Sequence, residues 1–295
     1  MTFRLEKLLE QLSKKEENEV LRNDVYLSMK NDLVKNPPAG KKKALQSKKK
    51  EVKEPSQDLE DRLLRNIKNI ESTVAELSQV STNQIMSWFQ EWFSIAQQHP
   101  WIGEPNAMCI STISTKNLSS GDDKSAKSLL FPDSRFVLLK GRDNSKGVFT
   151  FFTNYESNKG KQLTAYPQCS LLFYWEPLHA AVRVQGVVEK TSDQVSDEYW
   201  NSRPYQSQLC SAVSEQSRTV ENRGQLEKKL EQLNTKCEQD QKVPRPKHWG
   251  GFYVTALQIE FWKSGPYRFH HRVVFTRQNH TQTDKESWQA ALLQP

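Results

Sequence analysis

The amino-acid sequence predicts an α+β fold that is mainly β, with helices flanking an antiparallel barrel. Short apolar segments typical of strands recur between residues 106 and 277, and turn-forming segments separate them. Few long helical segments intervene, which disfavours a parallel sheet whose strands are joined by helices. No internal repeat is visible.

The first 80 residues differ from the rest and are predicted to form a charged N-terminal extension. Leucines near the start fall at helical spacing, and a second helical pattern runs from about Leu59 to Leu77. Residues 36–57 contain two lysine triplets, three prolines and no aromatic residue. Such a segment buries too little apolar area to offset the entropy of ordering, so we expect a disordered Lys-rich linker.

The formal net charge of +7 permits an anionic partner. For the Lys-rich linker, nuclear import and contact with nucleic acid or anionic lipid stay open, but a solvated tail is favoured because no aromatic side chain is present to stack on bases. The four cysteines form no CxxC motif, and no apolar segment is long enough for a signal peptide or a bilayer span. We therefore expect free thiols and a cytoplasmic location.

The second domain is predicted to span residues 81–295. It opens with a helix, capped by Ser81 or Thr82, whose apolar positions pack on the core. Residues 116–132 are polar and Ser-rich, so a loop is expected there, and residues 193–235 are expected to be helical with a break at Arg203 and Pro204. Strands are predicted over residues 106–114, 135–140, 148–153, 170–175, 181–190, 252–262 and 273–277.

Motifs for several common chemistries are missing from the sequence. It contains no GxGxxG after a strand, no GxxxxGK[ST], no HExxH and no GxSxG. The six histidines include the neighbours His270 and His271, but no third ligand lies at metal spacing. We therefore expect no metal site.

One candidate phosphate site lies in the segment YWNSRPYQS. Tyr199, Arg203 and Ser207 recur at i, i+4 and i+8, which predicts that they share one helical face. Phenol, guanidinium and hydroxyl groups on one face suit a phosphate. From spacing alone, a surface face with salt bridges is an equal alternative.

A second candidate site lies near the C-terminus, in IEFWKSGPYRFHHRVVF. Arg268, His270 and Arg272 alternate, which predicts one face of an extended segment. Three basic groups on one face repel each other unless an anion or an electron-rich ring lies opposite. A solvated sheet face is the alternative, but the apolar residues on both sides of the segment favour a buried setting.

Nine segments in order resemble the pyridoxine/pyridoxamine 5′-phosphate oxidase family: RFVLLKG, FFTNYESNKGKQL, LLFYWEPL, VRVQG, YWNSRPYQSQL, EQS, WGGF, IEFW and RFHHRVVF. The resemblance runs from about Trp88 to the end and does not cover the first 80 residues. It implies an FMN-binding split β-barrel and a homodimer with FMN at the subunit interface. It also implies a flavoprotein oxidoreductase of vitamin B6 metabolism, which oxidises pyridoxine or pyridoxamine 5′-phosphate to pyridoxal 5′-phosphate with O₂ as acceptor, giving H₂O₂.

The resemblance also implies roles for individual residues of this chain. Arg268 and His270 are expected over the substrate ring as catalytic residues, and Arg272 near the flavin ring would stabilise its anionic reduced form. The substrate phosphate is expected to contact Lys140, Tyr199, Arg203 and Ser207. The FMN site is expected to comprise Arg135, Phe136, Val137, Leu138, Phe152, Thr153, Lys159, Gln216, Ser217, Trp262 and Arg272.

The sequence departs from the family pattern at four places. Asn158 replaces an arginine beside Lys159, Ala181 replaces a flavin-contacting glutamine, His271 replaces an aspartate, and residues 292–295 lack the usual arginine. Losing one charge-assisted hydrogen bond to phosphate costs about 1.5–3 kcal/mol. These departures keep an alternative open, a weakly active or non-catalytic paralogue that binds FMN or pyridoxal 5′-phosphate as a carrier or sensor.

Overall fold

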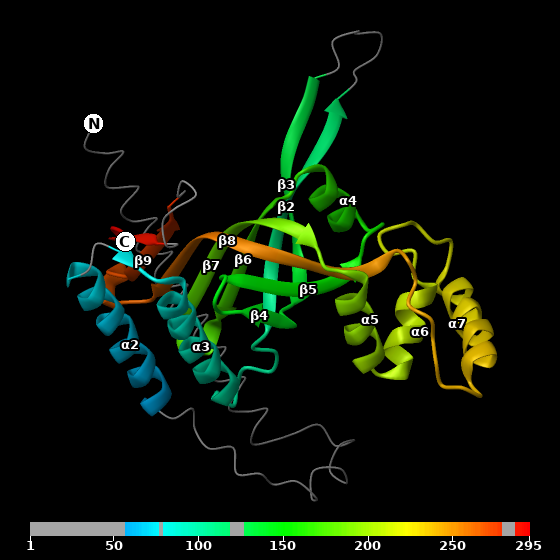
Figure 1. Cartoon of the computed structure of the whole chain (residues 1–295), viewed down its shortest axis with the longest axis horizontal. Helices are drawn as coiled ribbons and strands as arrows, with labels where there is room; N and C mark the ends of the chain where they lie inside the picture. Colours follow the sequence, from blue (N-terminus) through cyan, green and yellow to red (C-terminus); the bar gives the residue numbers. More distant parts are fainter. Residues whose placement is uncertain (1–56, 77–78, 119–126, 279–286) are drawn as a thin grey trace, which may run out of the picture. The chain divides into compact units, whose positions relative to one another are not determined.

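The computed structural model describes residues 57–76, 79–118, 127–278 and 287–295 (Figure 1). The helix predicted near the start and residues 36–56 of the predicted linker lie outside the described residues. Among those described, no helix is long and apolar enough to cross a membrane.

A ten-stranded sheet in which every strand pair is antiparallel forms the core, which confirms the predicted mainly-β, α+β class. Its main path runs β1-β10-β9-β8-β7-β6-β2-β3, while β5 pairs with β8 and β4 with β5. The strands are β1 (Gln79–Val80), β2 (Ala107–Leu118), β3 (Lys127–Leu138), β4 (Gly141–Asp143), β5 (Val148–Asn154), β6 (Gln168–Trp175), β7 (Ala180–Lys190), β8 (Trp249–Lys263), β9 (His271–Arg277) and β10 (Trp288–Leu292).

Strand β8 connects the two parts of this sheet. One of its edges pairs with β7 along most of its length, whereas the other pairs with β5 over residues 249–255 and with β9 over residues 258–263. The register with β7 shifts between Gln185 and Gly186. A Cβ at Gly186 would lie 2.4 Å from the carbonyl oxygen of Thr255, so this close approach requires glycine.

Helices cover the sheet at several places, and two short 3₁₀ turns join strands (Figure 1). Helix α3 begins where predicted, because the Ser81 hydroxyl accepts a hydrogen bond from the Gln84 N–H. The predicted break at Arg203 and Pro204 is confirmed, since one helix ends at Ser202 and the next begins at Tyr205. The helical elements are α2 (Gln57–Glu76), α3 (Thr82–Gln98), α4 (Asn158–Ala165), η2 (Glu176–Leu178), α5 (Asp193–Ser202), α6 (Tyr205–Val213), α7 (Arg223–Cys237) and η3 (Pro266–Arg268).

The segment predicted as a polar loop, residues 116–132, is strand at both ends. Residues 116–118 continue β2, and residues 127–132 begin β3, in unbroken antiparallel register. Backbone hydrogen bonds extend the paired strands β2 and β3 beyond their apolar residues. The polarity of the side chains did not indicate this extension. Residues 119–126 lie outside the described residues.

Helix α2 belongs to the same compact unit as the barrel, although the sequence assigned it to the N-terminal extension. That unit begins at Pro55 rather than at residue 81. Leu63, Ile67 and Ile70 are fully buried in the main core. Asn66 fixes the helix against α3, since its side-chain oxygen accepts a 2.7 Å hydrogen bond from the indole N–H of Trp92. The low average hydrophobicity of the first 80 residues concealed this apolar face.

We predict that Ile67→Ala lowers the free energy of unfolding by about 2–4 kcal/mol, because it leaves a cavity in the core. Lys68→Ala, at the exposed neighbouring position, should change it by less than about 0.5 kcal/mol. Urea denaturation of both variants measures the difference. Equal, small effects would show that α2 is not part of the folded domain.

Candidate functional site

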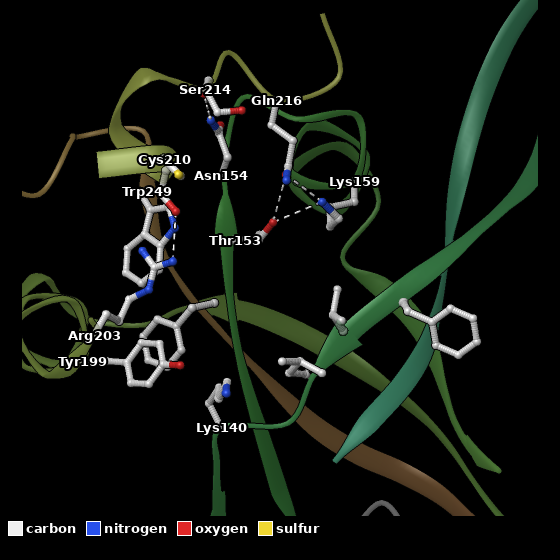
Figure 2. Close-up of a pocket in the computed structure, with 15 residues that line it drawn as sticks. Lys140, Thr153, Asn154, Lys159, Tyr199, Arg203, Cys210, Ser214, Gln216 and Trp249 are labelled. Carbon is white, nitrogen blue, oxygen red and sulfur yellow. Dashed lines mark hydrogen bonds between the residues drawn. The ribbon is translucent and has the colours of Figure 1, made fainter. Parts of the chain in front are cut away.

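A cavity of about 410 Å³ lies among the ends of β3 and β5, helices α5 and α6, and the start of β8 (Figure 2). The structure brings together here most of the residues that the sequence analysis assigned to the substrate phosphate and the flavin. They are Phe136, Val137, Leu138, Lys140, Phe152, Thr153, Lys159, Tyr199, Arg203 and Gln216. The sequence analysis missed Asn154, Cys210, Ser211, Ser214 and Trp249, which also line it.

Lys159 lies at one side of the cavity and is only 8% exposed. Its ammonium group donates hydrogen bonds to the Gln216 side-chain oxygen at 2.8 Å and to the Thr153 hydroxyl at 3.1 Å (Figure 2). Burial and, to a smaller extent, the nearby positive charge of Arg135 lower the pKa of Lys159 to about 8. Among the described residues no carboxylate is hydrogen-bonded to this ammonium, so the arrangement suits an anionic ligand.

The backbone around Lys159 completes this side of the cavity. The Ser157 hydroxyl caps α4 by accepting a hydrogen bond from the Gly160 N–H. The backbone N–H of Asn158 donates to the Ser217 hydroxyl at 3.3 Å, so the predicted residue Ser217 lies beside the start of α4. The helix N-terminus adds a positive partial charge at the same place.

Arg135 is already neutralised within the protein. Its guanidinium forms an ion pair with Asp133 and hydrogen bonds to the side chains of Gln162 and Thr112. Arg135 does not line the cavity, unlike the residues that follow it on β3. The sequence could not show this, because Gln162 comes from α4, far along the chain.

The other side of the cavity is aromatic and cationic. The rings of Phe152 and Tyr199 stack with centroids 4.0 Å apart, and Trp249 lies roughly parallel to both. The Arg203 guanidinium lies 4.7 Å from the centroid of the Trp249 ring (Figure 2). Burial lowers the pKa of Arg203, and its Nη1 has no hydrogen-bond partner among the described residues.

The expectation of one helical face for Tyr199, Arg203 and Ser207 holds only in part. Arg203 is the C-cap of α5, and its backbone is extended before Pro204. Ser207 therefore lies on α6 and is not among the lining residues. Ser211, one turn further along α6, accepts a 2.9 Å hydrogen bond from Arg203 instead.

A second pocket, of about 310 Å³, lies at the other end of β8 and contains Ala181, Trp262, His270 and Arg272. Its two arginines both pair with Glu260, which is buried and only 5% exposed. This carboxylate accepts hydrogen bonds from Arg272 at 2.7 and 2.8 Å and also forms an ion pair with Arg183. The sequence analysis missed Glu260, although an acid between two core residues of an apolar strand was a visible signal.

The predicted extended face of Arg268, His270 and Arg272 is wrong for Arg268. Strand β9 begins only at His271, and Arg268 is an exposed residue of the turn η3 with a φ of 63°. His270 does lie in the second pocket, with its ring centroid 4.9 Å from that of Trp262. Its Nδ1 accepts a hydrogen bond from the Gly265 N–H.

The two pockets are far apart within one protomer. Trp249 begins β8 in the first pocket, and Trp262 lies near its end in the second. At about 3.3 Å per residue, these tryptophans are about 40 Å apart along the strand. A single small ligand therefore cannot contact both groups of predicted residues in one protomer.

Comparisons with known proteins define the class of this chain. The family model described as pyridoxamine 5′-phosphate oxidase matches residues 95–237, and that described as the pyridoxine 5′-phosphate oxidase C-terminal dimerisation region matches residues 249–295. The chain belongs to the pyridoxamine 5′-phosphate oxidase family.

Individual relatives agree with this assignment. Pyridoxine-5′-phosphate oxidase of Bos taurus is 44% identical over 64% of this chain and 66% of its own length. Pyridoxine/pyridoxamine 5′-phosphate oxidase of Gloeothece citriformis is 44% identical over 63% of this chain and 79% of its own. The crystal structure of PhzG from Burkholderia lata, in complex with tetrahydrophenazine-1-carboxylic acid, matches with a TM-score of 0.58 and 23% identity, covering 71% of this chain and 92% of that one. This likeness shows the split-barrel fold alone.

We predict that Lys159→Met stabilises the ligand-free protein by about 1–3 kcal/mol at pH 7, because it removes a buried charge without a carboxylate partner. The folded-state pKa of about 8 lies below the ordinary value of 10.5, so the cost is fully present below pH 8 and disappears as the pH rises towards 10.5. Urea denaturation as a function of pH measures it. Lys161→Met, at an exposed position of α4, is the control. A stabilisation that does not decline above pH 8 would contradict this account.

Proposed function

We propose that this protein is an FMN-dependent oxidase that converts pyridoxamine 5′-phosphate or pyridoxine 5′-phosphate to pyridoxal 5′-phosphate. O₂ is the electron acceptor and H₂O₂ the second product. The proposal places the chain in vitamin B6 metabolism. All four cysteines are free thiols, which fits the cytoplasmic location that we propose.

The observation that carries this proposal is a cavity with two separate cationic sides. Lys159 lies on one side, and Arg203 and Lys140 lie elsewhere in the lining (Figure 2). The reaction requires two phosphorylated ligands at once, the cofactor and the substrate. One buried ammonium and one aromatic-backed guanidinium supply the two anion sites that this requires.

The donors around Lys159 fit the phosphate of FMN. We propose that Lys159, Thr153, Gln216 and Ser217 hold this phosphate, together with the N-terminus of α4. The family arginine is replaced by Asn158, whose backbone N–H donates to the Ser217 hydroxyl at this position. When bound, FMN would supply the two-electron acceptor that no side chain can provide.

The substrate phosphate is proposed to bind at Arg203, Tyr199 and Lys140. Trp249 lies under the Arg203 guanidinium and keeps its planar donors in one orientation. The stacked ring of Phe152 fixes Tyr199 in the same way. These residues would orient the substrate so that its reacting carbon lies in one defined place.

The catalytic residues Arg268 and His270 are proposed to come from the other subunit of a homodimer. They lie near the far end of β8, too distant to contact a ligand in the first cavity of the same protomer. The C-terminal part of the chain matches a dimerisation region. Exposed apolar side chains on the adjacent sheet face support this, since Phe136 is 76% and Tyr174 56% exposed.

Two further groups are proposed to act on the flavin from the second pocket. Glu260 fixes the guanidinium of Arg272, which would place a positive charge beside the ring where negative charge develops. Trp262 would pack against the ring. Ala181, opposite Trp262 in the strand register, offers no hydrogen bond there.

The direct test is an aerobic assay of FMN-saturated protein with pyridoxamine 5′-phosphate. We predict formation of pyridoxal 5′-phosphate with one H₂O₂ per turnover. Ala181→Gln should tighten FMN binding about fivefold, because it adds a hydrogen bond worth about 1 kcal/mol. Ala181→Leu has similar bulk without the amide and should not. Absence of product from FMN-saturated protein would refute the oxidase and favour the non-catalytic alternative.

A further inference from the structure

The loop that carries Arg268 and His270 is held mainly at its base. It spans residues 264–270, between the paired residues Lys263 and His271 at the ends of β8 and β9. Tyr267 and Arg268 have φ values of 54° and 63°, which are unfavourable for residues other than glycine. Tyr267 is fully exposed, so the tip has little packing to enforce this conformation within a protomer.

Helix α2 contacts the base of this loop through its acidic side chains. Glu71 forms a 2.9 Å hydrogen bond with Nδ1 of His271, and both side chains are only about a quarter exposed, at 26% and 23%. On the neighbouring strand, burial lowers the pKa of Lys263, and the carboxylate of Glu60 opposes that shift. Glu60 and Glu71 are eleven residues apart, close to three helical turns, so they lie on one face of α2.

The position of α2 is itself rigidly determined. Ile67 and Ile70, between the two acids, are fully buried, and Asn66 is hydrogen-bonded to Trp92. The Glu71 carboxylate is therefore presented to His271 from a helix that packs in the core. Adjacent strand residues point to opposite faces, so His271 is held from the α2 side while Arg272 is held by Glu260 from the other.

We propose that Glu71 is a positioning residue that acts through His271 to hold the catalytic loop in its productive conformation. Helix α2 lies outside the residues matched by the family models, 95–237 and 249–295. In this chain the acid expected next to His270 is replaced by His271, and a carboxylate is provided instead by α2. The catalytic consequence rests on the proposed oxidase function, whereas the effect on loop conformation does not.

The test compares Glu71→Ala, His271→Ala and the double variant with the full-length wild type, all saturated with FMN. We expect each single variant to lower kcat about tenfold, with KM and FMN affinity nearly unchanged, because a small displacement of catalytic groups is costly. The double variant should be no slower than the singles, since both remove the same interaction. Glu76→Ala, an exposed acid at the end of α2, is the matched control.

Hydrogen–deuterium exchange provides a readout that does not depend on turnover. Amides of residues 264–270 should exchange several-fold faster in Glu71→Ala than in Glu76→Ala, while those of β7 should not change. Unchanged exchange in this loop, or multiplicative losses of kcat in the double variant, would overturn the proposal. A wild type that shows no turnover would contradict the oxidase function, and the exchange comparison would still decide the role of Glu71.

A back-substitution gives a sharper test of the same pair. His271→Asp restores the family residue, but here it places a second carboxylate against Glu71. We expect His271→Asp to be slower than His271→Ala, and Glu71→Ala to restore activity in that background. If His271→Asp were more active than His271→Ala while Glu71 is present, the proposal would be overturned.

Discussion

The length of strand β8 is the constraint on which the rest of the site depends. Its fifteen residues pair with β5 at one end and with β9 at the other, so they hold two groups of functional side chains about 40 Å apart along the chain. Neither group is complete. The cavity at Trp249 contains the residues proposed to bind phosphate but neither Arg268 nor His270, whereas the pocket at Trp262 contains His270 and lies beside the turn that carries Arg268. We propose that a second copy of the chain brings the two groups together.

The hydrogen-bond partners of the buried polar side chains separate two kinds of group. Some are paired within the protein and stabilise the fold, whereas others have no carboxylate partner among the described residues and suit an anionic ligand. Glu260 forms ion pairs with Arg272 and Arg183, and Glu71 forms a hydrogen bond with His271. These carboxylates fix the positions of strands and loops. Lys159 instead donates to a hydroxyl and an amide and has a lowered pKa. A buried ammonium without a carboxylate partner lowers the stability of the folded protein, and such groups are typical of binding and catalytic sites.

Local sequence patterns predicted the class of fold, and the family resemblance implied most residues of the first cavity, but neither indicated the relations between distant segments. The β-rich pattern, the cap at Ser81 and the break before Pro204 depend on neighbouring residues, and the structure confirms all three. The pairing of Glu71 with His271 joins residues 200 positions apart, so no local pattern could show it. Spacing also failed at Arg268, because a turn with positive φ interrupts the alternation that a strand would require.

The central claim, that each site combines both ends of β8 from two subunits, is tested by mixing two inactive variants. Arg203→Ala removes the proposed substrate-phosphate site, and Arg268→Ala removes a proposed catalytic residue of the opposite end. If the site is shared, a refolded equimolar mixture should regain about a quarter of wild-type activity, because half the dimers are mixed and each has one intact site. If both residues serve the same protomer's site, no mixed dimer has an intact site and activity stays at the level of the single variants.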